Sequence, residues 1–283
     1  MHRQTTRRGF LGGTAAMAGI GALAASPQAA RGAATDFKLG VASYSFRKFN
    51  RQQAIEMTKK CGVHYINIKD VHLPLTSSAD EIAKAREEIT SAGLIIEGGG
   101  NISLAKPDEA DIRQKFEYAK RAGMPVMVCA PSMESLPIVE KMVEEFNIWV
   151  AIHNHGPEDK HFPTPQSVLK AVKNMDPRMG LCIDAGHTVR TGVDVVESVH
   201  AAGGRLHSMH IKDLRSFYDK GSQVPVGDGM IPIAGIFREL QKINYEHGVM
   251  LEYEVQADDP LPGMIKSFAY MRGVIAGLKT ANV

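Results

Sequence analysis

Cysteine is scarce in this chain of 283 residues, which contains only three, and they are not arranged in pairs. Cys61, Cys129 and Cys182 each lie inside an apolar run rather than in a loop. An odd set of this kind excludes a disulfide framework and indicates cysteines that are packed in a core.

Basic runs are also missing after the first 34 residues. That segment holds Arg3, Arg7, Arg8 and Arg31 and no acidic residue, so its removal lowers the formal net charge from +2 to about −2. A near-neutral chain without a basic run lacks the electrostatic footprint of a nucleic-acid-binding protein. We therefore expect no nucleic-acid partner.

No apolar run is long enough for a stable membrane anchor, which needs roughly 20 residues. The run at residues 12–25 is short and rich in Gly and Ala, and it follows the twin-arginine signature Thr6-Arg7-Arg8-Gly9-Phe10-Leu11. Residues 1–34 are therefore interpreted as a cleaved twin-arginine signal peptide, and the mature protein as periplasmic or secreted. Because this route exports proteins already folded, it suits a protein that binds a metal ion before export.

Residues 35–283 alternate between short apolar runs and amphipathic segments, and the alternation repeats eight times. Such repetition over about 250 residues, with no long structureless insert, predicts one domain of the α/β class, a single (β/α)8 TIM barrel. The expected strands are 38–44, 64–68, 94–97, 125–130, 149–154, 180–184, 206–211 and 249–253, and helices are expected at 51–60, 79–91, 109–121 and 193–202.

Two neighbouring strand ends carry the most specific signal. The run at 180–183 stops at Asp184 and is followed by His187, and the next run ends with His210. Parallel neighbours place such side chains at the same end of the sheet, within reach of one divalent ion. Two alternatives remain open: Asp184 caps the following segment, and His210 is an ordinary core histidine.

Three further strand ends add polar side chains, namely Glu97, His153 with His155, and Glu252 with Glu254. Side chains two residues apart on a strand point the same way, so one member of each pair could reach a metal ion and the other a substrate.

The predicted metal ligands are His153, Asp184, His210 and Glu252. Two carboxylates and an imidazole suit Mn²⁺, Mg²⁺, Co²⁺ or Zn²⁺, and a second imidazole disfavours Mg²⁺. The expected cofactor is therefore one divalent ion, with Mn²⁺, Zn²⁺ or Co²⁺ favoured over Mg²⁺. The alternative for His153 is a supporting hydrogen bond to one of the ligands.

Substrate contacts are expected from His155, His187, Lys212 and Glu254. Two of these have plainer alternatives: Lys212 could form a salt bridge with Asp213 that fixes the turn, and Glu254 could pair with a nearby cation.

The chain from about Phe37 onward resembles the xylose isomerase-like barrels of the AP endonuclease family 2 superfamily, which include sugar isomerases and epimerases, inosose isomerases and dehydratases, and endonuclease IV-type enzymes. The motifs that carry the resemblance are Ala151-Ile152-His153-Asn154-His155-Gly156, Cys182-Ile183-Asp184-Ala185-Gly186-His187, His207-Ser208-Met209-His210-Ile211-Lys212-Asp213, Val226-Gly227-Asp228-Gly229 and Leu251-Glu252-Tyr253-Glu254. By this resemblance, Asp184, His210 and Glu252 match three of the family's four metal ligands. His155 stands where relatives carry a histidine or lysine that contacts the substrate.

His153 departs from the family pattern, which has a glutamate at that position. In the family's epimerases, two metal-bound glutamates exchange protons with one carbon from opposite sides of the sugar. Only Glu252 of that pair is present, so His153, His155 or Glu97 would have to supply the second group. The predicted catalytic residues are accordingly Glu252, His155 and Glu97.

The leading hypothesis is a divalent-metal-dependent sugar isomerase or epimerase that removes a proton next to the carbonyl of a free or keto-sugar. A lyase or dehydratase acting on a keto-glycoside or inosose begins with the same step and stays open. A phosphodiesterase of endonuclease IV type is disfavoured because it needs several ions and a basic groove. A sugar-binding barrel without activity is the remaining alternative. The expected partner is a small-molecule carbohydrate, and the sequence is compatible with a homo-oligomer.

Overall fold

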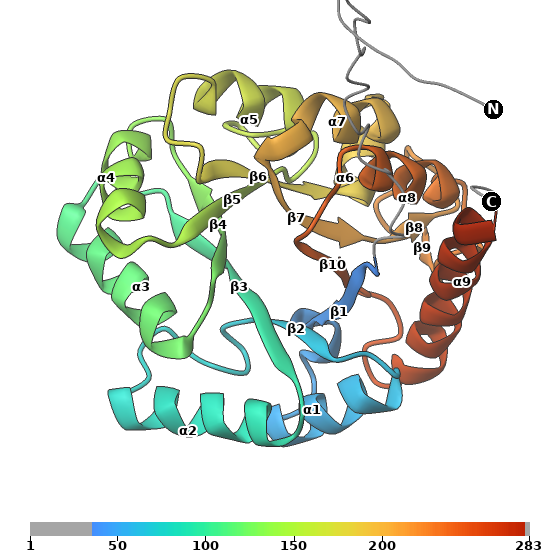
Figure 1. Ribbon diagram of the computed structural model, residues 1–283, viewed down its shortest axis with the longest axis horizontal. Coiled ribbons are helices and arrows are strands. Elements are labelled where there is room, and N and C mark those ends of the chain that lie inside the picture. Colours follow the sequence, from blue (N-terminus) through green and yellow to red (C-terminus); the bar gives the residue numbers. More distant parts are fainter. Residues whose placement is uncertain (1–35, 281–283) are drawn as a thin grey trace, which may run out of the picture. The chain divides into compact units, whose positions relative to one another are not determined.

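Eight parallel strands close into a barrel in the computed structural model, which describes residues 36–280 (Figure 1). The order around the barrel is β1-β10-β7-β6-β5-β4-β3-β2. The strands are β1 (Lys38–Ala42), β2 (Tyr65–Ile68), β3 (Ile95–Leu104), β4 (Val126–Pro131), β5 (Trp149–His153), β6 (Met179–Asp184), β7 (Leu206–Ile211) and β10 (Gly248–Leu251). The predicted single (β/α)8 barrel is confirmed. The predicted signal peptide lies outside the described residues.

Helices follow the strands along the chain and form a ring outside the barrel (Figure 1). They are α1 (Arg51–Lys60), α2 (Ala79–Ser91), α3 (Glu109–Ala122), α4 (Leu136–Phe146), α5 (Pro165–Val172), α6 (Ala185–Arg190), α7 (Val195–Ala202), α8 (Ile233–Lys242) and α9 (Leu261–Thr280). The first two have the predicted bounds, because Asn50 and Ser78 cap them and accept an N–H bond from the third helical residue.

Apolar side chains fill the wall between strands and helices, and smaller ones fill the middle of the barrel. The inner group consists of Val126, Val128, Ala151 and Cys182. Because side chains alternate along a strand, Ala151 and Cys182 face inward while their neighbours Val150 and Leu181 pack in the outer core. The inward positions above this apolar layer, at the carboxyl ends of the strands, are left for polar side chains.

The third strand is longer than predicted. It runs to Leu104 instead of ending at residue 97. A Cβ atom at Gly98 would lie 2.7 Å from the Val126 carbonyl oxygen, and Gly100 has a φ of 114°. Glycine at these positions therefore permits the close approach and irregular path of β3 beside β4. The extension moves Glu97 away from the carboxyl end of the barrel.

The segment after β7 forms a small excursion that the sequence did not predict. Its two-stranded antiparallel sheet pairs β8 (Asp213–Leu214) with β9 (Gln223–Val224). The Gln223 amide donates to the Glu252 carbonyl oxygen at 2.8 Å and accepts from the Glu254 backbone N–H at 3.0 Å. The excursion is thereby attached to the backbone on both sides of Tyr253, directly after Glu252.

Asp213 holds the turn that follows this small sheet. Its buried carboxylate accepts N–H bonds from Gly227, Gly229 and Ile231 at 2.9, 3.0 and 3.0 Å. Three backbone donors on one carboxylate explain why the turn keeps its shape without regular secondary structure.

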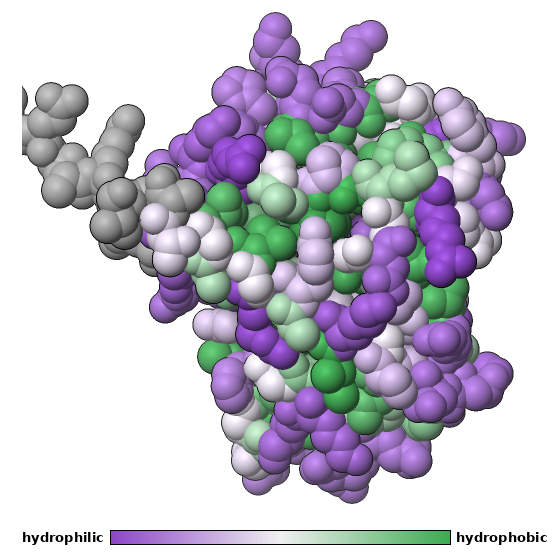
Figure 2. Space-filling view, turned by 90° about the vertical axis from the view of Figure 1, so that its right-hand side faces the viewer, coloured by the Kyte–Doolittle hydropathy of each residue, from purple (hydrophilic) through white to green (hydrophobic). Residues whose placement is uncertain are grey.

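The outer surface beside α8 and α9 interleaves hydrophilic and hydrophobic residues (Figure 2). Within residues 36–280, no helix has the length and apolar character needed to cross a membrane.

Candidate active site

Four metal-competent side chains converge at the carboxyl end of the barrel. His153 ends β5, Asp184 ends β6, His210 lies near the end of β7, and Glu252 directly follows β10. Each offers one ligand atom, and these atoms all lie within 4.8 Å of one another. All four side chains are buried. The structure therefore brings together the complete predicted ligand set.

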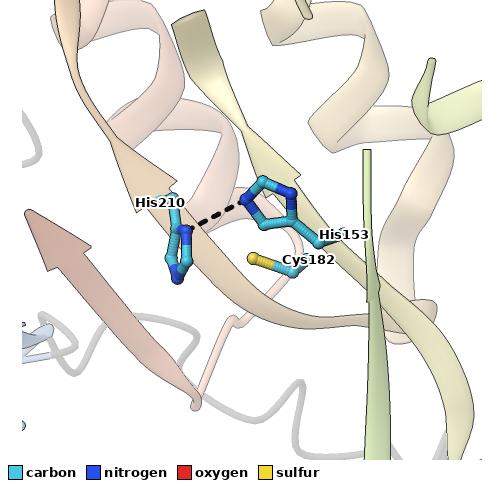
Figure 3. A group of neighbouring side chains, drawn as sticks. All are labelled: His153, Cys182 and His210. Atoms are coloured by element: carbon cyan, nitrogen blue, oxygen red, sulfur yellow. Dashed lines mark hydrogen bonds between the residues drawn. The ribbon is translucent and has the colours of Figure 1, made fainter. Parts of the chain in front are cut away.

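The spacing within this group is close to that of ligands around a single ion. His153 Nε2 lies 3.1 Å from His210 Nδ1, the contact drawn as a dashed line in Figure 3. Asp184 Oδ2 is 3.5 Å from His153 Nε2, and Glu252 Oε2 is 3.5 Å from His210 Nδ1. Ligands bound at about 2.0 to 2.3 Å to one ion have separations of this size.

Asp184 caps α6, as one interpretation of its sequence context predicted, and keeps a second oxygen within the group of predicted ligands. Its Oδ1 accepts the His187 backbone N–H at 2.8 Å and so caps α6, while its own N–H donates to Asn154 Oδ1 at 3.0 Å. These bonds fix the carboxylate, and among the described residues its buried Oδ2 faces no other donor than the ammonium of Lys212, 3.1 Å away, and the His153 ring. Burial opposes the charged form, but Lys212 and His187 lower the pKa of Asp184 well below its usual value. A fixed, ionised carboxylate oxygen is what a metal ligand requires.

The donor set fits one divalent ion. Two imidazoles and two carboxylates match the preferences of Mn²⁺, Co²⁺ and Zn²⁺ better than those of Mg²⁺. Asp184 Oδ2 faces this group, 3.5 Å from His153 Nε2, and His210 Nε2 is buried without a hydrogen-bond partner in the part of the chain that the structure describes. His153 is neutral, because burial lowers its pKa well below the usual value, and a neutral imidazole is the metal-binding form.

Lys212 lies among the acidic ligands. Its ammonium nitrogen is 3.1 Å from Asp184 Oδ2, 2.8 Å from Glu252 Oε2 and 2.6 Å from Glu254 Oε2, and its side chain is 4% exposed. Burial opposes the charge, but the three carboxylates raise the pKa of Lys212 well above its usual value. Glu254 thus pairs with a cation, as one interpretation proposed, whereas Lys212 is paired with these acids instead of Asp213.

His155 is held beside the centre by two side chains. Asn101 Nδ2 lies 2.7 Å from its Nε2, and Asp159 Oδ2 lies 3.2 Å from its Nδ1. The arrangement that satisfies both contacts has Nδ1–H directed at Asp159 and the Nε2 lone pair facing the Asn101 amide. Burial and then the neighbouring His187 lower the pKa of His155. Sequence reasoning missed Asn101, which lies within the unpredicted extension of β3.

His187 lies at the rim of the same group. Its ring centre is 5.8 Å from those of both His153 and His155, and its Nδ1 is 3.4 Å from Arg190 Nη1. The side chain is half-buried, so it can reach a ligand that enters the barrel mouth.

Glu97 is not part of this site. It lies in the first half of β3, and its Oε1 is 3.0 Å from the ammonium of Lys38 at the start of β1. A Cβ atom on Gly248, the first residue of β10, would lie 2.7 Å from Glu97 Cγ. The amino ends of parallel strands meet at the opposite end of the barrel, so the structure separates Glu97 from the predicted ligands.

Comparison with known proteins agrees with this architecture. The profile of a family described as xylose isomerase-like TIM barrel matches residues 55–274. An inosose dehydratase of Clostridium tetani (strain Massachusetts / E88) is 27% identical over 150 residues, which are 47% of this chain and 50% of the relative. The match therefore spans half the length of that curated relative.

Two solved sugar epimerases have the same fold. The apo form of 3-keto-D-glucoside 4-epimerase YcjR from E. coli superposes with a TM-score of 0.70 and 16% identity, covering 84% of this chain and 99% of that chain. D-Psicose 3-epimerase from Clostridium cellulolyticum H10, solved with D-tagatose, gives a TM-score of 0.68 and 18% identity, covering 84% of this chain and 99% of that chain. At these identities the likeness shows the fold alone.

Proposed function

Since the chain belongs to the xylose isomerase-like TIM barrel family, we propose that it is a divalent-metal-dependent sugar isomerase or epimerase. It acts on a free or keto-sugar by removing the proton next to the carbonyl. The observation that carries this proposal is the convergence of His153, Asp184, His210 and Glu252 at the carboxyl end of the barrel, where enzymes of this fold have their active sites.

The four converging residues would hold the ion with both carboxylates charged. Despite burial, Cys182 and Glu252 raise the pKa of His210 to about 10, so this imidazole would release a proton when the ion binds. When bound, the ion supplies positive charge that stabilises the oxyanion formed as the proton leaves. The buried surroundings strengthen every charge interaction at this point, because water is largely excluded.

Glu252 is assigned to the proton transfer. Its Oε2 contacts Lys212 and His210, which leaves Oε1 as the atom that takes the proton. Lys212 keeps Glu252 ionised, since its nearby ammonium, together with His210, holds the pKa of this carboxyl well below the usual value despite burial. The ionised Glu252 carboxylate can accept the proton once the bound substrate places the reacting carbon within about 3 Å of Oε1.

His155 and His187 are assigned to substrate hydroxyl groups. Both are less deeply buried than the four ligands and lie next to them at the barrel mouth. Asn101 fixes the ring of His155, so its role is to position that histidine.

A dehydratase is the second candidate, and the unequal sides of the centre favour it. Glu252 is the only glutamate in the four-residue group, and His153 stands where the epimerases that the chain resembles carry a second glutamate. The Lys212 ammonium, 2.8 Å from Glu252, could donate a proton to a departing hydroxyl group on the same side as the base. The similarity to an inosose dehydratase is in keeping with this reaction.

Proton NMR in D₂O distinguishes these reactions. Metal-loaded protein is incubated with a panel of free sugars, keto-sugars, keto-glycosides and inososes. An isomerase or epimerase incorporates deuterium next to the carbonyl and yields a sugar of the same formula, whereas a dehydratase yields a product that has lost water. Absence of both exchange and product across the panel would contradict the proposed function.

A further inference from the structure

A buried thiol lies next to the two histidines of the proposed centre. Among residues 36–280, His153, Cys182 and His210 form a second group whose ligand atoms all lie within 4.8 Å of one another. Figure 3 shows the Cys182 thiol directed toward the space between the two imidazole rings. All three side chains are buried, with Cys182 fully enclosed.

The position of Cys182 follows from the register of the sheet. It lies on β6 two residues before Asp184, so both side chains face the inside of the barrel. Cys182 is opposite His153 on β5, and Asp184 is opposite His210 on β7. The thiol is therefore one layer deeper than the carboxylate, on the apolar side of the histidine pair.

The two histidines thus have two sets of partners. Toward the barrel mouth they are joined by the oxygens of Asp184 and Glu252, and toward the interior by the sulfur of Cys182. Oxygen ligands suit hard ions such as Mn²⁺, whereas thiolate and imidazole together suit Zn²⁺, Cd²⁺ and Co²⁺.

We propose that His153, Cys182 and His210 form a second metal-binding site, which takes thiophilic divalent ions deeper in the barrel than the carboxylate site. The two sites exclude one another because they share both histidines, so the chain holds one ion at a time. Binding breaks the S–H bond of Cys182, forms a sulfur–metal bond and releases the proton to solvent. This inference rests on the histidine pair of the proposed function and extends it to a choice between two classes of ion.

The test uses Co²⁺, Cd²⁺ and Mn²⁺ with metal-free full-length protein. In the wild-type chain, Co²⁺ and Cd²⁺ should each give the ultraviolet charge-transfer absorption of a thiolate–metal bond. Cys182→Ser should remove that absorption and weaken Cd²⁺ binding about 10-fold or more, while Mn²⁺ binding changes by less than about 3-fold. Cys129→Ser is the matched control, because Cys129 is equally buried but belongs to no metal-competent group in the described part of the chain. It should retain the absorption.

The outcomes separate this site from the proposed function. Normal Mn²⁺ binding without a thiolate band for Co²⁺ or Cd²⁺, or a band that persists in Cys182→Ser, would overturn the sulfur site alone. Failure of all three ions to bind would overturn the carboxylate centre and the sulfur site together. Should Cys182→Ser not fold, cadmium NMR of the wild-type protein decides the matter, since the chemical shift reports whether sulfur is a ligand.

Discussion

The ammonium of Lys212 lies 2.8 Å from Glu252 Oε2, inside a group of residues that is otherwise suited to a metal ion. The same nitrogen contacts Asp184 Oδ2 at 3.1 Å. Two buried carboxylates this close would repel each other strongly without a cation, so the lysine compensates their charge. A divalent ion bound by the same carboxylates would also compensate their negative charge. The contribution of Lys212 to stability should therefore depend on whether the ion is bound.

Lys212→Met should destabilise the metal-free protein by about 3 to 5 kcal/mol, because it leaves buried carboxylates without their counter-charge. The loss should be smaller in the metal-loaded protein, where the ion supplies positive charge. Urea denaturation with and without Mn²⁺ measures both values. Lys242→Met, which removes an exposed partner of Glu239, is the control and should cost less than about 1 kcal/mol in both states. An equal loss with and without the ion would show that lysine and ion are not coupled.

Asp184→Asn should reduce metal affinity at least about 10-fold, since it replaces a charged oxygen ligand by a neutral amide. The amide oxygen can still cap α6, so the fold should persist. Isothermal titration with Mn²⁺ measures the change, and circular dichroism checks the fold. Asp111→Asn, on the outer surface of α3, should bind Mn²⁺ normally. Unaltered Mn²⁺ affinity in Asp184→Asn would remove Asp184 from the ligand set.

His207 makes stability depend on pH. Burial lowers its pKa from 6.5 to about 4, so between these values the unfolded chain binds a proton that the folded chain does not. The stability that neutral His207 contributes to the folded protein is complete above about pH 6.5, the pKa of an unfolded-chain histidine. It is lost as the pH falls toward 4, by up to about 1.4 kcal/mol per pH unit. The free energy of unfolding of wild type and His207→Gln is measured at several pH values. The difference between the two profiles is the effect of His207, because the other histidines titrate in both proteins. Parallel pH profiles would contradict the assignment.

The N-terminal segment carries a separate proposal, that the protein is exported folded by the twin-arginine route. Replacing Arg7 and Arg8 by lysine should leave an uncleaved precursor in the cytoplasm. Cell fractionation with immunodetection reads the result, and the wild-type chain is the reference. Normal cleavage and export of the double variant would contradict the proposal.

The sequence was sufficient to predict the barrel and its four metal-competent side chains because each signal was local. Every one of those residues follows a short buried run that is apolar enough to be recognised as a strand. Parallel strands then place their carboxyl ends together, whatever the details of packing.

Features that depend on irregular backbone or on distant partners were not predictable in this way. Glu97 was placed wrongly because the glycines after it continue β3 and do not end it. Asn101 belongs to that extension, and its contact with His155 joins residues far apart in the sequence. The three carboxylates around Lys212 likewise come from two other strand ends, those of β6 and β10, so its sequence neighbour Asp213 was a misleading partner.

Exchange of the substrate hydrogen next to the carbonyl, followed by NMR in D₂O, tests the central claim most directly when wild type, Glu252→Gln and Glu97→Gln are compared with one substrate. Glu252→Gln should lower the exchange rate by about 10²-fold to 10⁴-fold while the protein still binds the substrate. Glu97→Gln should exchange at the wild-type rate, since Glu97 lies at the other end of the barrel beside Lys38. Exchange at the wild-type rate in Glu252→Gln, or its loss in a folded Glu97→Gln protein, would contradict the assignment of the active site to Glu252 and the carboxyl end of the barrel.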